Sequence, residues 1–320
     1  MKRVKTPILK HFFVVLVFLS CWQCTKEVTV PFPSHSPQLV VNALFQTDSL
    51  FYVTLGESRS LLDDRLLSPI TDATVKLYQD NDSIDALIWE GEAYRSSAKG
   101  IANTPYQLNI TYKEQQLSAK DLLPSTPQLK NIFYQDSVYF GGEGEYYSQL
   151  NLEIKNNLKE KSFYEIVLYF KKEHIKEEVI NQQIFNWNPF ISNAFFDDVN
   201  NDHIILTEGL LEYYPPSILF SNSNFIKDNQ SLKINFRPFR STFFDSNTDR
   251  KTYLILKFRQ VSEHYYRYKR NLYIHLNNQE NDIWDGTGEP ITVYSNIENG
   301  LGIFAGFNEV IDTVQKRELP

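Results

Sequence analysis

The chain has 320 residues and a formal net charge of −7, with 23 Phe and 19 Tyr but only one Met and 12 Gly. An acidic chain argues against nucleic-acid binding, because phosphate contacts require clustered Lys and Arg side chains. Aromatic and β-branched residues with few stretches of helical period predict a chain built mainly of strands.

The first 20 residues have the composition of a secretory signal peptide. Four basic residues and no acidic residue precede the apolar run "FFVVLVFLS", which ends at Ser20. A transmembrane helix needs about 20 apolar residues, so this run is too short to span a bilayer. We therefore predict a cleaved signal peptide over 1–20, and its removal would change the net charge from −7 to −11.

The only two cysteines of the chain, Cys21 and Cys24, lie directly after this leader. In bacterial lipoproteins a small residue precedes a cysteine that is lipidated and becomes the first residue of the mature chain. Ser20 before Cys21 fits that pattern, whereas Gln23 before Cys24 does not, so we expect Cys21 to carry the lipid. A Cys21–Cys24 disulfide or a pair of buried thiols is the alternative. More than one acyl chain on Cys21 would anchor the protein stably to a membrane.

Residues 21–37 are predicted to form a lipidated tether, because "TVPFPSHSP" holds three prolines in nine residues and favours an extended chain. Short alternating strands then predict an immunoglobulin-like β-sandwich over 38–126. Pro124 and Pro127 mark its end. The expected strands are "QLVVNALF", "SLFYVTLGES", "ATVKLYQ", "YQLNITY" and "QLSAKDLLP".

Residues 127–320 are predicted to form a second β-sandwich-like domain with one covering α-helix. The helix is expected near 262–279, with Ser262 as its N-cap, because four apolar or aromatic residues recur there at helical spacing. These residues are Tyr265, Tyr268, Leu272 and Leu276. The expected strands are "NIFYQDSVYF", "SQLNLEIKN", "FYEIVLYFKKE", "SLKINFRPF" and "TYLILKFRQV". The closing stretch "ITVYSNIENGLGIFAGFNEVIDTV" is expected to form a strand, a tight turn at Gly300, Gly302 and Gly306, and a closing strand. The predicted fold class is therefore all-β.

The order of these segments resembles a known family. A lipobox is followed by "CTKE", a proline tether, "LVVNALF", "LSAKDLLPSTPQL", a Tyr-rich helix and "VYSNIENGLGIFAGFN". This order is similar to the domain of unknown function 4249 family of Bacteroidota outer-membrane lipoproteins, over about 21–314. The run "SNIENGLGIFAGF" is the most specific piece, and the part around 172–215 matches poorly and reads as an insertion. The resemblance implies proximity to TonB-dependent receptors, and it implies no activity, since none is established for the family as a whole.

Bacteroidota export systems O-glycosylate Asp-Ser or Asp-Thr followed by a small or aliphatic residue. A glycan at such a position would add bulk and solubility to an exposed loop. Four positions of the chain match this pattern, and together they agree with an exported lipoprotein. They are Ser49, Ser83, Ser137 and Thr313.

The sequence contains no familiar catalytic motif, with neither HExxH nor a Gly-x-Ser-x-Gly elbow. His264 and His275 lie eleven residues apart on the expected helix, a spacing that does not by itself make a metal site. Asp198, Asn200 and Asp202 alternate as at the start of a calcium loop, but His203 replaces the expected glycine. A polar turn is the alternative for this segment. We therefore expect no catalytic residue, no metal and no cofactor.

Two aromatic-rich segments, 184–198 and 210–220, are more apolar than ordinary surface loops. They could form a contact surface for a partner, or they could fold back onto the sandwich as a small additional core. The candidate anchors are Trp187, Phe190, Phe195, Phe196, Tyr213 and Tyr214.

Together these features predict an outer-membrane-anchored lipoprotein that is not an enzyme. It would act as an accessory or binding subunit, with an outer-membrane β-barrel, a TonB-dependent receptor, as partner. The alternative is a surface ligand-capturing or adhesive protein that uses the aromatic-rich insertion at about 184–220. A hydrolase is a third hypothesis, which would need a nucleophile, a base and an orienting group brought together by the fold. The sequence indicates neither the periplasmic nor the cell-surface face of the membrane.

Overall fold

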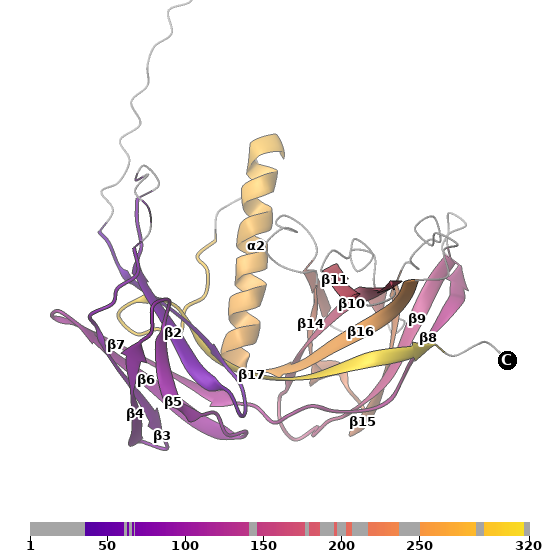
Figure 1. Ribbon diagram of the computed structural model, residues 1–320, viewed down its shortest axis with the longest axis horizontal. Coiled ribbons are helices and arrows are strands. Elements are labelled where there is room, and N and C mark those ends of the chain that lie inside the picture. Colours follow the sequence, from indigo (N-terminus) through magenta and orange to yellow (C-terminus); the bar gives the residue numbers. More distant parts are fainter. Residues whose placement is uncertain are drawn as a thin grey trace, which may run out of the picture. The chain divides into compact units, whose positions relative to one another are not determined.

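The computed structural model describes residues 36–60, 63, 66, 68–140, 146–176, 179–185, 195–196, 203–206, 217–236, 250–285 and 291–316. Residues Pro37–Pro320 form one compact unit. Strands make up most of the regular structure, and α2 is the one α-helix among the described residues (Figure 1). The prediction of an all-β fold with one helix is confirmed.

The first seven strands enclose the N-terminal core. In β1, Leu39, Val41, Ala43 and Phe45 are buried and alternate with more exposed residues, as expected for a sheet with one face in the core. Antiparallel pairing joins the strands in the order β1–β2–β5–β4–β3–β6–β7. Their bounds are β1 Leu39–Phe45, β2 Leu50–Glu57, β3 Thr74–Gln79, β4 Asp82–Trp89, β5 Tyr94–Lys99, β6 Thr104–Tyr112 and β7 Gln115–Leu123.

The next nine strands form two layers around a second core. One layer holds β8, β9, β15 and β12, and the other holds β13, β14, β10, β11 and β16. Leu152 of β9 and Ile166 of β10 both lie in this core. The bounds are β8 Gln128–Phe140, β9 Tyr146–Lys155, β10 Phe163–Lys176, β11 Val179–Phe185, β12 Phe195–Phe196, β13 His203–Leu206, β14 Ser217–Ser221, β15 Asn229–Phe236 and β16 Arg250–Val261, with a 3₁₀ turn at Asn222–Asn224.

The C-terminal strand β17 (Leu301–Lys316) contributes to both cores. It runs parallel to β1 from Leu301 to Gly306 and then antiparallel to β16, before it reaches β8 (Figure 1). Phe304 lies in the N-terminal core and Val314 in the second core. One 16-residue strand therefore connects the two halves of the compact unit.

Helix α2 (Glu263–Asp285) begins where the sequence predicts a helix and extends beyond the predicted end at 279. Ser262 is its N-cap, since Ser262 Oγ accepts a hydrogen bond from the Tyr265 backbone N–H at 3.1 Å. Tyr265 is buried, and Tyr268 packs against the small cluster of Phe163, Val261, Tyr265, Ile303 and Ala305. None of the helices in the described ranges is long and apolar enough to cross a membrane.

Candidate functional site

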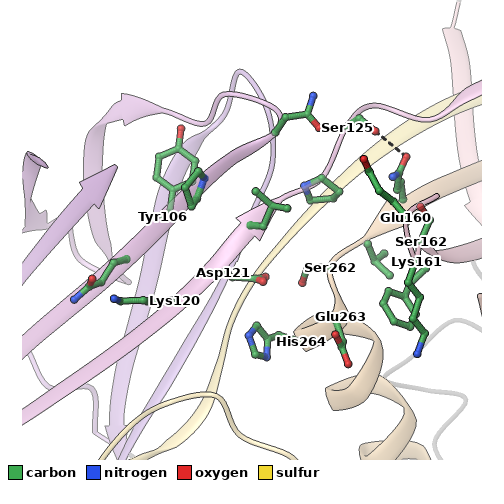
Figure 2. Close-up of a pocket in the computed structure, with 18 of the residues that line it drawn as sticks. Tyr106, Lys120, Asp121, Ser125, Glu160, Lys161, Ser162, Ser262, Glu263 and His264 are labelled. Carbon is green, nitrogen blue, oxygen red and sulfur yellow. Dashed lines mark hydrogen bonds between the residues drawn. The ribbon is translucent and has the colours of Figure 1, made fainter. Parts of the chain in front are cut away.

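A groove of about 730 Å³ lies between the N-terminal strands and the start of α2 (Figure 2). One wall comes from β6, β7 and residues Pro124 and Ser125, which follow β7. The other wall comes from residues 160–163 and 260–264. Asn308 Nδ2 donates to the Pro124 carbonyl at 2.6 Å, and Ser125 Oγ donates to Gln260 Oε1 at 3.1 Å. These bonds fix the two walls, so the groove is a formed feature of the fold.

Asp121 lies in the groove facing Ser262 (Figure 2), and the residue is buried, with 8% of its surface exposed. Its Oδ2 accepts a hydrogen bond from the Gly306 N–H at 2.8 Å, and the carboxyl also bonds Ser262 and the Leu122 N–H. Burial raises the pKa of Asp121 to about 7, although these hydrogen bonds oppose the rise. One carboxyl therefore joins β7, β17 and the N-cap of α2, and it titrates near neutral pH.

His264 forms part of the groove at the first turn of α2 (Figure 2). Its Nδ1 shares a hydrogen bond of 2.6 Å with the Tyr294 hydroxyl, and the Arg267 guanidinium lies 4.3 Å from the centre of the Tyr294 ring. Burial lowers the pKa of His264, which favours the neutral imidazole. The ring is thus oriented by Tyr294 and presents its other nitrogen as a polar group.

The remaining charged groups of the groove are exposed and of both signs. Lys120 and Lys161 contribute positive charge, and Asp80, Glu160 and Glu263 contribute negative charge. Such a lining can bind a polar protein segment through ion pairs and hydrogen bonds. The Ser262 hydroxyl, which bonds the Asp121 carboxyl, also caps α2 by accepting a hydrogen bond from the Tyr265 N–H.

A buried ionic cluster fixes α2 to the sheet beside the groove. Glu165 is fully buried and accepts hydrogen bonds from Arg259 Nη1 at 2.8 Å, Tyr265 Oη at 2.8 Å and Lys269 Nζ at 3.3 Å. Burial raises the pKa of Glu165, but the charges of Lys269 and Arg259 outweigh it and lower the pKa to about 2. Glu309 completes the cluster by accepting from Arg259 Nε at 2.9 Å. The cluster positions the helix and leaves its charges paired.

Comparison with known proteins decides the family. The sequence model of the family described as Domain of unknown function (DUF4249) matches residues 25–312, which is most of the chain. The chain belongs to this family. The predicted resemblance is thereby confirmed, and the matched region contains the N-terminal core, the groove, α2 and all of the second core except Val314. No curated protein matches the chain.

The structure explains the closing "SNIENG" motif that marked the DUF4249 resemblance. The side-chain amide of Asn296 bonds Phe304 as the backbone of a neighbouring strand would. Its Oδ1 accepts a hydrogen bond from the Phe304 N–H at 3.0 Å, and its Nδ2 donates one to the Phe304 carbonyl at 2.7 Å. The Glu298 N–H donates to the Ser118 carbonyl at 2.8 Å, and Asn299 Nδ2 donates to the Gln116 carbonyl at 3.2 Å. The motif therefore covers the outer edge of β7, which would otherwise expose unpaired carbonyl groups.

The predicted modification sites are spread over the fold of this DUF4249 protein. Ser49 is half-buried beside β2, Ser83 is exposed in β4, and Thr313 is exposed in β17. Ser137 lies in β8, but its side chain is outside the described residues. Modification of these positions stays a prediction.

Most of the other predicted site residues lie outside the described part of the chain. Phe195 and Phe196 form β12, which pairs with β15, but their side chains are not described. The lipid site, the calcium-like loop and the other aromatic anchors cannot be placed: they are Cys21, Asp198, Asn200, Asp202, Trp187, Phe190, Tyr213 and Tyr214. Among the residues that are described, no three His, Cys, Asp or Glu side chains gather closely enough to hold a metal ion.

Sequence reasoning missed Asp121 and Glu165, although each carries a readable signal. Asp121 follows Leu117 and Ala119 at the inward positions of β7, so an acid occupies a core-facing position. Glu165 lies in the run "FYEIV", where apolar residues face both sides of the strand. An acid in either context indicates a partnered buried carboxyl.

Proposed function

We propose that this DUF4249 protein is an outer-membrane lipoprotein, anchored through Cys21, that acts as a non-catalytic binding subunit beside a TonB-dependent transporter. The observation that carries the proposal is the order of segments at the N-terminus. Basic residues, a short apolar run and Ser20–Cys21 are followed by a proline-rich stretch, and the compact unit then begins at Pro37. This order provides an anchor, a spacer and a folded unit that could reach a neighbouring barrel.

The groove supports a binding role. Its walls are held by hydrogen bonds between segments distant in sequence, so a partner would not have to order it on binding. Its exposed charges are of both signs, which suits a polar loop of a protein partner. The net charge of −11 after removal of residues 1–20 disfavours adhesion to anionic lipid or nucleic acid.

The anchor is tested by metabolic labelling with a palmitate analogue and by membrane fractionation. We expect the wild-type protein to take up label and to sediment with outer membranes. Cys21→Ser should lose both the label and the membrane association, whereas Cys24→Ser, the matched control, should retain both. Label that depends on Cys24, or membrane association without either cysteine, would contradict the proposal.

The partnership is tested by a pull-down of the tagged protein from native outer membranes in mild detergent. We expect one β-barrel protein in stoichiometric amount. The double variant Glu160→Lys with Lys161→Glu keeps the net charge but exchanges the charges in the groove, and it should lose the barrel. The control Lys113→Glu with Glu114→Lys makes the same exchange in the β6–β7 turn and should retain it. Recovery of the lipoprotein without a barrel would overturn the accessory role and favour ligand capture by the segment at about 184–220.

A further inference from the structure

Polar residues and Tyr78 occupy the outward positions of β3, β6 and β7 over three adjacent rows, and the next row, Pro105–Leu122, is apolar and borders the groove beside α2. The inward residues of these strands, such as Leu77, Leu108 and Leu117, are buried in the N-terminal core. The outward residues align across the sheet in register, because Lys76 pairs with Asn109, and Asn109 pairs with Ser118. The neighbouring rows are Thr74–Thr111–Gln116 and Tyr78–Gln107–Lys120.

This face is also hollowed. It borders a cavity of about 620 Å³, and the "SNIENG" motif forms the wall of that cavity beside β7 through Glu298 and Asn299. The other outward face of the same half differs, since Leu44, Tyr52 and Ile88 are exposed there. The polar hollow, with its fixed wall, lies on the β3–β6–β7 side.

Two amide side chains in this hollow are oriented by each other. Gln107 Nε2 donates to Asn109 Oδ1 at 2.7 Å, which leaves Gln107 Oε1 as an acceptor and Asn109 Nδ2 as a donor. An adjacent acceptor and donor match neighbouring hydroxyl groups, each of which can both donate and accept. Tyr78 lies half-buried in the same row as Gln107 and offers an aromatic ring to the apolar face of a sugar.

The charge of the hollow argues for an uncharged ligand. Among the described residues that line it, Lys76 and Glu298 are the charged ones, and their charges balance. Glu298 is engaged as well, because it accepts a hydrogen bond from Ser118 Oγ. The remaining polar groups are amides and hydroxyls, which bind neutral polyhydroxylated molecules through hydrogen bonds.

We propose that the outer face of β3, β6 and β7 is a binding site for a neutral oligosaccharide, with Gln107, Asn109 and Tyr78 as the contact residues. The rows run across three strands, so the ligand is a chain of several sugar units and not a single one. This site adjoins the groove beside α2, since Gln107 lines both, but the proposal does not depend on the transporter partnership.

The test uses the full chain, purified in a detergent without a sugar headgroup. Isothermal titration calorimetry is performed with maltohexaose, cellohexaose and mannohexaose as neutral probes and with hexagalacturonate as an acidic probe. We expect at least one neutral hexasaccharide to bind. The double variant Gln107→Ala with Asn109→Ala should weaken that binding by at least about tenfold, since it removes two oriented hydrogen-bonding groups.

The control is Asn42→Ala, which removes an exposed amide from the outward face of β1 and should bind as the wild type does. Thermal unfolding checks that both variants are folded, and Tyr78→Ala provides a second variant if the double variant does not fold. Binding of none of the neutral probes, undiminished binding by the variants, or tighter binding of the acidic probe would each overturn the proposal. Asn109 and Tyr78 line the hollow and not the groove, so Asn109→Ala with Tyr78→Ala should weaken hexasaccharide binding but still recover the barrel in the pull-down, which keeps this result distinct from the transporter test.

Discussion

The backbone N–H of Gly306 donates a hydrogen bond to the Asp121 carboxylate, although 185 residues separate the two in sequence. This bond joins β17 to β7, and the same carboxyl bonds the N-cap residue Ser262. The C-terminal strand, an N-terminal strand and α2 therefore meet at one buried acid. A group of this kind makes the stability of the groove depend on pH.

Asp121→Asn should flatten that dependence. The pKa of Asp121 is raised from 3.8 to about 7, so the folded protein binds more protons than the unfolded chain between these values. The stability of the wild type is thus highest at low pH within this range and falls as the pH rises toward 7, by about 2–3 kcal/mol between pH 5 and pH 8. Urea unfolding at the two pH values measures the difference.

The Asn variant should lose most of this pH dependence, because an amide does not titrate. Asp72→Asn, which changes an exposed carboxyl of the same half, is the control and should leave the dependence unchanged. Equal slopes for the wild type and Asp121→Asn would show that Asp121 is not the titrating group.

The sequence predicts the period-two strands and the capped helix well, because each depends on local patterns. Ser262 and Tyr265, for example, are recognised from neighbours within one helical turn. The pairing of β1 with β17 is different, since a parallel contact between Val41 and Gly302 has no local signature. Residues 38–126 contain the strands of the first sandwich, but Phe304 completes its core.

The candidate site could not be predicted from the sequence either, because it depends on contacts between segments that are distant in sequence. Its walls come from β7, from the segment before β10 and from the start of α2, and only the tertiary fold brings these together. The predicted glycine turn is wrong at Gly302, which lies inside β17, and residues 291–297 before it form no strand. Gly302 is instead required by close approach within a strand, where it has a φ of 109°.

Glu165→Gln should destabilise the fold by about 3–5 kcal/mol, because it leaves the buried charges of Arg259 and Lys269 without their central carboxylate. Chemical denaturation at pH 7 measures the loss. Glu309→Gln is the graded control, since Glu309 is one-fifth exposed and contacts only the Arg259 side of the cluster, so its effect should be clearly smaller.

The wild type should also lose stability as the pH falls from about 4.5 toward 2. The pKa of Glu165 is lowered to about 2 in the folded protein, so its contribution is present above pH 4.5 and disappears on acidification. Equal effects of Glu165→Gln and Glu309→Gln would contradict the central role of Glu165.

Asn296→Ala should cost about 2–4 kcal/mol, because it leaves both the N–H and the carbonyl of buried Phe304 without their partner. Asn296→Asp should cost less, since the carboxylate still accepts from the Phe304 N–H but cannot donate to its carbonyl. Unfolding free energies of the two variants give the order. A smaller effect of Ala than of Asp would show that the side chain does not act as a strand substitute.

Gly302→Ala should be among the most damaging single substitutions in the described fold. An added Cβ would lie within van der Waals overlap of the Val41 carbonyl oxygen, and the φ of 109° is unfavourable for any residue with a side chain. Together these effects should cost more than about 3 kcal/mol and separate β17 from β1. Gly56→Ala is the matched control, because a Cβ at Gly56 in β2 meets no atom within 4 Å. Thermal unfolding should therefore show a large decrease in Tm for Gly302→Ala and little change for Gly56→Ala, and similar Tm values for the two variants would rule out the close approach of β17 and β1 as a determinant of stability.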